Sequence, residues 1–172
     1  DVVLAYESPI ERAFYATKVS DGDGGPPHCS SSDGKVGFGT RDMDTILNAA
    51  NMDDLVGTEK DCNDCAFSKF GSNLEGGKGQ ACKQKVRLVV FSEDNLLPMV
   101  LQIPSASLKG FKQYKLKLLN GRKRISRTVT RLSLVKVLGS PDYFTVNFAF
   151  VRDLQDGERE RLAGLAKILS DA

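Results

Sequence analysis

The 172-residue sequence predicts a mainly β chain with helices, arranged as an antiparallel barrel with a long glycine-rich insertion and a C-terminal helix. Two observations support the barrel. Runs rich in β-branched and aromatic residues are more numerous than helical patterns, and they do not alternate with helices in the way that builds a parallel sheet. A third observation defines the insertion, because all four cysteines lie in or beside one glycine-rich stretch.

The first strands are expected at residues 2–6 and 12–19, which carry the β-branched and aromatic residues that suit a pleated sheet. Residues 21–40 are rich in Gly, Pro, Ser and Asp and predict a loop. Residues 40–56 show a weak helical pattern, and residues 59–84 predict a loop again. The segment between the early strands and the next regular structure is therefore expected to be mostly irregular.

Two more strands are predicted at residues 86–91 and 96–103. A helix follows at residues 108–119, where apolar residues recur on one face. Ser105 or Ser107 is expected to cap its first turn, because a serine hydroxyl can accept a hydrogen bond from a free helical N–H.

A hairpin is predicted from residues 125–138 and 143–151. The second run alternates cleanly, and we assign one set of its side chains to the core: Phe144, Phe148 and Phe150. Residues 156–169 predict a final amphipathic helix.

About five antiparallel strands with a helix before the last hairpin fit the oligonucleotide-binding (OB) barrel. We therefore predict a single OB-like domain over residues 1–172, with residues 21–85 as its insertion.

The cysteine pattern is typical of a structural metal site. Cys62 and Cys65 are separated by two residues, so both thiolates can reach one zinc ion at about 2.3 Å. Cys29 and Cys82 would complete a tetrahedral shell, which leaves no open position for catalysis. His28, the single histidine, is a reserve ligand. We expect a structural Zn²⁺ ion; disulfides, a redox pair and inert thiols are the alternatives.

Charge is distributed unevenly along the chain, although the net charge is only +2. Residues 1–66 carry 5 Lys and Arg against 13 Asp and Glu, whereas residues 67–136 carry 15 against 3. Such a basic block attracts phosphate backbones. The alternative is a solvated surface that the acidic N-terminal part neutralises.

A site for single-stranded nucleic acid needs cations for phosphates and aromatic faces for bases. The candidate cations are Lys78, Lys83, Lys85, Arg87, Lys112, Lys115, Arg122, Lys123, Arg124, Arg127 and Arg131. The candidate stacking residues are Phe70, Tyr114 and Tyr143, each of which could instead pack in the core. Arg127 and Arg131 are four residues apart on a predicted strand and should share one face. Sequence-independent binding is expected, because no recognition helix or finger motif is present.

Several segments resemble uncharacterised proteins of phages and mobile elements. They are residues 28–34 (HCSSSDG), 62–72 (CNDCAFSKFGS), 77–83 (GKGQACK), 97–114 and 129–136, and the resemblance spans roughly residues 28–150. Ala66 stands where the family pattern has a proline. The resemblance implies a zinc-containing, OB-like protein that binds single-stranded DNA in phage replication or recombination.

The expected function is therefore a non-enzymatic binder of single-stranded nucleic acid, DNA or RNA, with no small-molecule substrate. A single histidine gives acid–base catalysis one candidate, and the paired acids Asp42/Asp44 and Asp53/Asp54 fall outside predicted strands. The alternatives are a protein-interaction module that docks on host replication or transcription machinery and, third, a metal-dependent nuclease. A replication protein or a second copy of the chain is an expected partner.

No apolar run is long enough to span a bilayer, and no signal peptide is recognised at the start of the sequence. The expected location is the cytoplasm, which is the host cytoplasm if the protein is phage-encoded.

Overall fold

The computed structural model describes residues 1–15, 26–39, 59–74, 76–92, 97–139 and 142–170. The chain separates into two compact units. One contains residues 1–7 and 87–172 and is termed the hairpin unit; the other contains residues 8–86 and is termed the cysteine unit. The insertion predicted at residues 21–85 lies inside the cysteine unit. The helix predicted at residues 40–56 and the end of the strand predicted at residues 12–19 lie outside the described residues.

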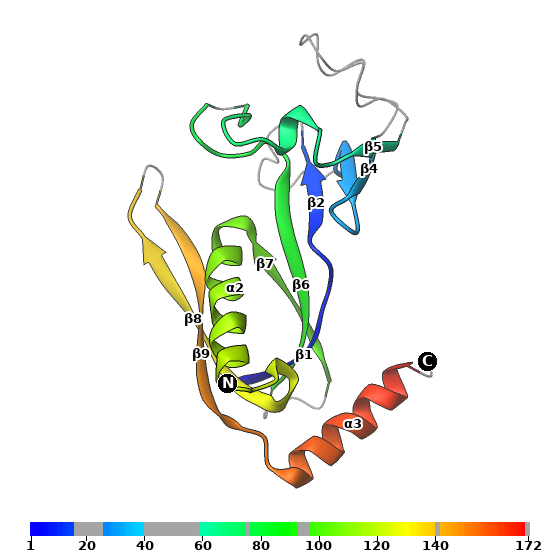
Figure 1. The fold of residues 1–172 in the computed structure, drawn as a ribbon, viewed down its shortest axis with the longest axis vertical. Coiled ribbons are helices and arrows are strands. Elements are labelled where there is room, and N and C mark those ends of the chain that lie inside the picture. The colour runs from blue at the N-terminus through cyan, green and yellow to red at the C-terminus, as the bar shows by residue number, and fades with distance from the viewer. Residues whose placement is uncertain (16–25, 40–58, 75, 93–96, 140–141, 171–172) are drawn as a thin grey trace. The chain divides into compact units, whose positions relative to one another are not determined.

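The cysteine unit is built from short strands. They are β2 (Glu11–Phe14), β3 (Cys29–Ser31), β4 (Val36–Gly39), β5 (Glu59–Asp61) and the first residues of β6 (Lys83–Ser92). Neighbouring strands pair antiparallel in the order β5–β4–β3–β2–β6 (Figure 1). A single-turn 3-10 helix, η1 (Ala66–Ser68), follows β5.

Strands β3 and β4 correct the prediction that residues 21–40 form a loop. Their turn is held by side chains, because Asp33 Oδ1 accepts the backbone N–H groups of Lys35 and Val36 at 2.8 and 3.1 Å. Gly34 has a φ of 71°, a conformation that glycine adopts without strain. Polar turn residues thus close a hairpin whose strands are too short to show β alternation in the sequence.

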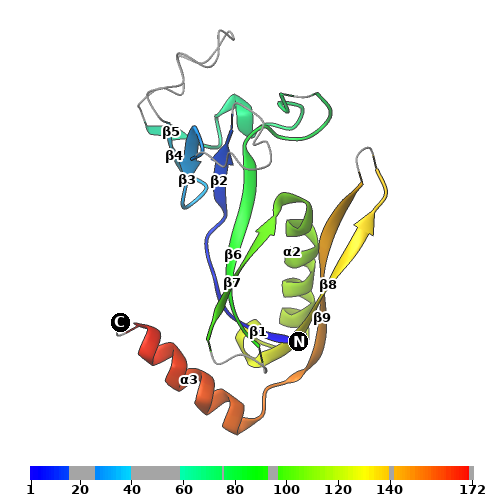
Figure 2. The ribbon, with the colours of Figure 1, turned by 180° about the vertical axis from the view of Figure 1, so that it is seen from behind.

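The hairpin unit contains the longer elements. They are β1 (Val2–Glu7), the remainder of β6, β7 (Met99–Pro104), α2 (Ser105–Asn120), η2 (Ile125–Arg127), β8 (Thr128–Val137), β9 (Tyr143–Asp153) and α3 (Asp156–Ser170). The strands are hydrogen-bonded in the order β6–β1–β8–β9, and β7 pairs with β6 (Figure 2). The predicted hairpin and the C-terminal helix are both present.

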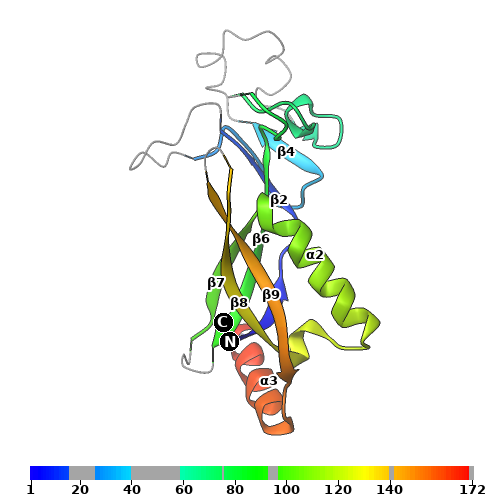
Figure 3. The same ribbon diagram turned by 90° about the vertical axis from the view of Figure 1, so that its left-hand side faces the viewer.

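The prediction of a mainly β chain with helices is confirmed, but the sheet is open within the described residues and not a closed barrel. Among the described strands, β9 pairs only with β8. Helix α2 lies alongside β9 (Figure 3). The hydroxyl of Ser107 on this helix accepts the backbone N–H of Val146 on β9 at 2.9 Å. A helix side chain therefore occupies a position on the strand edge that a closing strand would use.

One part of the core of the hairpin unit forms where α2 meets β9, and another groups Val3, Val129 and Leu154. Phe111, Tyr114 and Leu118 are buried at helical spacing. Phe148 packs against two of them, with ring centroids 5.0 Å from Phe111 and 5.9 Å from Tyr114. The Tyr114 hydroxyl lies 2.7 Å from Thr130 Oγ1, so the polar end of the buried ring has a partner.

Two sequence predictions about this region are wrong. Phe148 is buried, but Phe144 is 57% exposed and Phe150 is 39% exposed, because α2 covers the strand only around Phe148. The helix begins after Pro104 without a side-chain cap, and the buried Ser107 hydroxyl bonds to β9 instead.

Within the part of the chain that the structure describes, no helix combines the length and the apolar character needed to cross a membrane.

Candidate metal centre and nucleic-acid interface

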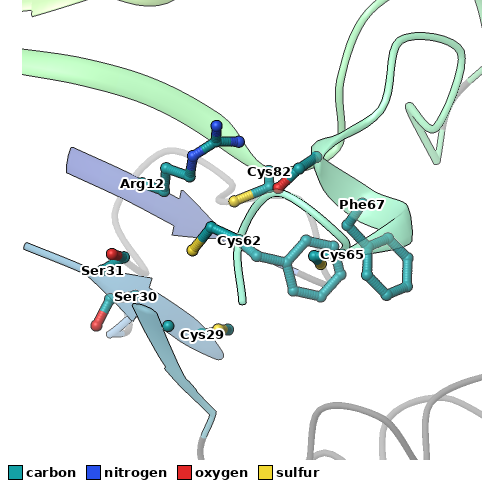
Figure 4. A pocket seen from close by; sticks show the side chains of 11 residues that line it. Arg12, Cys29, Ser30, Ser31, Cys62, Cys65, Phe67 and Cys82 are labelled. Atoms are coloured by element: carbon teal, nitrogen blue, oxygen red, sulfur yellow. The ribbon is translucent and has the colours of Figure 1, made fainter. Parts of the chain in front are cut away.

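All four cysteines line one small cavity in the cysteine unit (Figure 4). Cys29 begins β3, Cys62 and Cys65 belong to the turn after β5, and Cys82 directly precedes β6. The cavity volume is about 10 Å³, which is the space for one water-sized sphere. The four thiols are free and form no disulfide.

Gly37 on β4 lies against two of these sulfurs. A Cβ atom at this position would lie 3.2 Å from Cys29 Sγ and 3.4 Å from Cys62 Sγ. The glycine is buried, and any larger residue would compete with the sulfurs for the cavity. The lack of a side chain at position 37 therefore keeps the space between these thiols open.

Backbone hydrogen bonds fix the segments that carry the cysteines. The N–H of Cys62 donates to Lys35 O at 2.7 Å, and the N–H of Cys82 donates to Phe67 O at 2.9 Å. The rings of Phe14 and Phe67 lie 4.5 Å apart beside the cavity. Three segments that are distant in sequence are thus connected independently of the sulfurs.

Burial raises the pKa of the Cys29 thiol to about 11, and the nearby Cys62 and Cys65 add to the shift. Burial likewise raises the pKa of Cys82 to about 12, with smaller contributions from neighbouring thiols, and it raises the pKa of Cys62. Without a cation these thiols stay protonated at neutral pH. A divalent cation would have to displace their protons on binding.

Two unpartnered donors test whether the cavity fits a metal–thiolate group. Among the described residues, the buried side-chain N and O atoms without a hydrogen-bond partner are Arg12 Nη1 and Ser68 Oγ, and both residues line this cavity. A zinc ion with four thiolates carries two negative charges, and its sulfurs accept hydrogen bonds. The donor set fits this group, because Arg12 and Ser68 would gain the acceptors that they lack.

The four thiols line one cavity, but their sulfur atoms are not arranged around a common point as metal ligands are. Within the described residues, no group of three or more His, Cys, Asp or Glu side chains is arranged to hold a metal ion as it stands. Binding an ion would require the thiol side chains to turn toward the centre of the cavity. His28 is not among the lining residues, and its backbone N–H donates to Phe14 O at 2.8 Å.

Phe70 stands on a loop that begins at the cysteine cluster. Its side chain is 83% exposed, the highest value among the exposed large hydrophobic residues described. The N–H of Gly71 donates to Gly79 O at 3.0 Å, and the Ser72 hydroxyl donates to Phe67 O at 2.9 Å. These bonds close the loop and tie it to η1, so the exposed ring is held on a compact support.

Lysines accompany Phe70 on this loop. Lys69 precedes it and donates to the carbonyl of Asn63. The N–H of Gly71 also contacts Lys78 O at 3.3 Å, which brings the Lys78 backbone next to Phe70. Lys83 donates to Gln80 O at 2.7 Å. None of these three lysines forms an ion pair with a described residue.

The other candidate cations divide between the units. Lys85 in the cysteine unit lies 3.9 Å from the buried carboxylate of Glu11. In the hairpin unit, Lys115 pairs with Glu7, Lys123 pairs with Asp153, and Arg131 forms two hydrogen bonds with Asp1 at 2.8 and 2.9 Å. Of the remaining candidate cations, Lys112, Arg122, Arg124 and Arg127 are exposed and form no ion pair with a described residue, and Arg87 is also exposed.

Two of the three expectations that follow need correction, those for Tyr114 and Arg127. Tyr114 is buried with its hydroxyl against Thr130, so its faces are not a stacking platform. Tyr143 is exposed, as stacking would require. Arg127 ends η2 and does not lie on β8, so it does not share a strand face with Arg131.

Sequence reasoning missed Lys69 beside Phe70. The signal was local, since Lys69 and Lys78 flank the aromatic residue in the glycine-rich loop. The exposed ring of Phe150 was also missed as a surface feature, because it was assigned to the core. Alternation along β9 assigns Phe150 to a face, but it cannot show where α2 stops covering that face.

Comparison with protein-family models, with curated proteins and with solved structures finds no match for this chain. The geometry of the cysteine unit is therefore the basis for a functional assignment.

Proposed function

We propose that this protein is a non-enzymatic binder of single-stranded nucleic acid whose cysteine unit is braced by one structural zinc ion. The observation that carries the proposal is the exposed ring of Phe70, held on a compact loop beside the cysteine cluster and accompanied by lysines. An aromatic platform next to cations is the combination that binds unpaired bases and their phosphates.

Cys29, Cys62, Cys65 and Cys82 would hold the zinc ion. The ion supplies a cross-link among segments that are distant in sequence, and such sites contribute folding free energy directly. The chain's own residues complete the centre. Gly37 leaves room for the sulfurs, and Arg12 places a positive charge beside the thiolates. Because η1 and the Phe70 loop follow Cys65 directly, the zinc ion would also position the ring.

Stacking on Phe70 explains why a large apolar side chain is left in water. A base that covers the ring removes apolar surface from water, and such stacking contributes about 1–3 kcal/mol per base. Lys69, Lys78 and Lys83 would contact phosphates, and these contacts weaken as salt rises. Neither stacking nor phosphate contact reads a base edge, so the binding is expected to be independent of sequence.

The hairpin unit offers further contacts of the same kind, since Tyr143 is exposed and Lys112, Arg122 and Arg124 carry no ion pair to a described residue. The resemblance to phage and mobile-element proteins supports a setting in replication or recombination in the host cytoplasm. That setting and the choice of DNA over RNA are parts of the proposal.

The test compares the affinity of labelled dT oligomers for wild-type, Phe70→Ala and Phe38→Ala proteins, measured by fluorescence anisotropy. Phe38 is a matched control, because it is 58% exposed in the same unit but lies on β4, outside the Phe70 loop. Phe70→Ala should weaken binding by roughly 5- to 150-fold, the equivalent of one lost stacking contact. Phe38→Ala should bind like the wild type. No complex at 50 mM salt, or equal losses in the two variants, would refute the proposal.

A further inference from the structure

The hairpin unit contains a groove between α2 and β9 that is separate from the cysteine cavity. Its volume is about 610 Å³, within the range of about 300–1,000 Å³ that is usual for ligand pockets. Residues of α2 and of the turn that follows it line one side, among them Gln113, Lys117 and Lys123, and residues 147–150 of β9 line the other.

The β9 side of this groove is an open strand edge. The N–H of Val146 points away from β8, because it donates to Ser107 Oγ on α2. Backbone groups alternate in direction along a strand, so the N–H and C=O groups of Phe148 and Phe150 point to the same side as those of Val146. In the described part of the chain, α2 supplies no side-chain hydrogen bond to Phe148 or Phe150. Such an edge is a template for one more strand.

The lining of the groove is positive and apolar. Lys117 and Lys123 line it, and Arg122 and Arg124 lie in the turn after α2. The ammonium group of Lys123 lies 4.5 Å from the centre of the Phe150 ring and also pairs with Asp153. No acidic residue is among the described residues that line the groove. The charge therefore favours an anionic ligand that can also cover an aromatic ring.

We propose that the groove binds an extended acidic peptide segment of a partner protein, which adds to the edge of β9 as an extra strand. The backbone of the segment would pair with Phe148 and Phe150, and its acidic side chains would approach Lys117 and Lys123. Because successive side chains alternate between the two faces of a strand, the acidic side chains would share the face of Lys123 and the Phe150 ring, and the apolar side chains would lie on the opposite face. A peptide fits this edge better than an oligonucleotide does, because only a peptide has N–H and C=O groups at the repeat of a strand.

The first test uses the full chain and a labelled octapeptide in which Glu and Asp alternate with Val and Leu. A peptide with Lys in place of each acid is the charge control. The acidic peptide should bind and the Lys peptide should not. Lys117→Glu should weaken binding by roughly tenfold or more, equivalent to one contact made repulsive. Lys112→Glu is the matched control on the same helix, because Lys112 does not line the groove, and it should bind like the wild type.

A second pair of variants separates strand addition from contact with the ring alone. Phe150→Val removes the ring but keeps the backbone N–H, whereas Phe150→Pro removes both. Proline is tolerated at an edge position whose N–H faces outward, and circular dichroism would verify that the variant is folded. The valine variant should retain measurable binding, whereas the proline variant should lose it.

Three outcomes would overturn the inference: no binding of the acidic peptide, equal losses in the valine and proline variants, or equal losses in Lys117→Glu and Lys112→Glu. A fourth outcome concerns nucleic acid. If a dT oligomer displaces the peptide, and the affinity for that oligomer falls in Lys117→Glu, the groove binds nucleic acid and the peptide inference is wrong. Phe70→Ala should leave peptide binding unchanged, so this test is independent of the proposed function.

Discussion

Cys29 and Cys62 bring their sulfur atoms within 3.4 Å of a single point, the position where a side chain on Gly37 would begin. The two thiols come from different segments, and both lie against the space that a side chain at position 37 would fill. A metal centre here would depend on this space as much as on the ligands themselves.

Gly37→Ala should therefore weaken zinc binding. The added methyl group would push on two sulfurs at once, and perturbations next to metal ligands typically cost roughly 10- to 100-fold in affinity. Competition with a chromophoric chelator measures this change. Gly164→Ala is the control, because nothing lies within 4 Å of its new Cβ. Equal zinc affinity in Gly37→Ala and the wild type would show that the sulfurs do not close on this space.

Replacing Arg12 by Met should also lower zinc affinity, although Arg12 is not a ligand. The substitution removes a positive charge that lines the thiol cavity and leaves the negative charge of the thiolates without compensation. Arg12→Lys keeps the charge and should recover part of the affinity. The same chelator competition, together with the visible spectrum of the Co²⁺-substituted protein, would measure both variants. If the Met and Lys variants bind zinc equally well, charge compensation by Arg12 is excluded.

Tyr114→Phe should destabilise the hairpin unit without changing nucleic-acid affinity. The substitution leaves the fully buried Thr130 hydroxyl without its partner at 2.7 Å, at a cost of about 1–3 kcal/mol in the free energy of unfolding. Adding Thr130→Val removes the orphaned hydroxyl and should recover most of the loss. Urea unfolding measures the free energy of unfolding of the wild type, the two single variants and the double variant. A lower affinity for dT oligomers in a folded Tyr114→Phe protein would show that Tyr114 contributes to nucleic-acid binding.

Acid should loosen the start of α3. Glu158 accepts hydrogen bonds from Arg152 and from the backbone N–H of Gln155, and these two bonds lower the pKa of Glu158 from 4.5 to about 2. Because the folded pKa lies below the unfolded value, ionised Glu158 stabilises α3 fully above about pH 4.5. That stabilisation is lost as the pH falls through about 2.

Hydrogen exchange in α3 between pH 6 and 2 would detect this loss. Glu158→Gln should remove this part of the pH dependence, whereas Glu160→Gln on the same helix should keep it. Identical pH profiles for the wild type and Glu158→Gln would exclude the carboxylate as the cause.

Features set by the spacing of nearby residues were predictable from the sequence, whereas features set by packing against a distant element were not. The two-residue spacing of Cys62 and Cys65 predicts that one turn brings both thiols to the same side. Cys29 and Cys82 were then expected to complete the group, and all four do line one cavity. The β8–β9 hairpin was predictable for a similar reason, since alternation over a long strand defines its two faces. The burial of Tyr114 could also have been read from its helical spacing with Phe111 and Leu118.

Features that depend on another element were not predictable in this way. Phe144 and Phe150 share a face with Phe148, and only the path of α2 decides that Phe148 alone is covered. Strands β3 and β4 contain Ser and Gly and owe their order to pairing and to the Asp33 turn. Ser107 is at a plausible capping position, but β9 offers its hydroxyl a buried N–H instead.

Native mass spectrometry of the purified chain would show whether the four thiols hold one zinc ion. We expect one zinc per wild-type chain with no disulfide, and loss of the ion in each single Cys→Ser variant. A wild-type chain that stays metal-free after incubation with zinc, or a single Cys→Ser variant that retains the ion with unchanged affinity, would exclude a four-thiol zinc site.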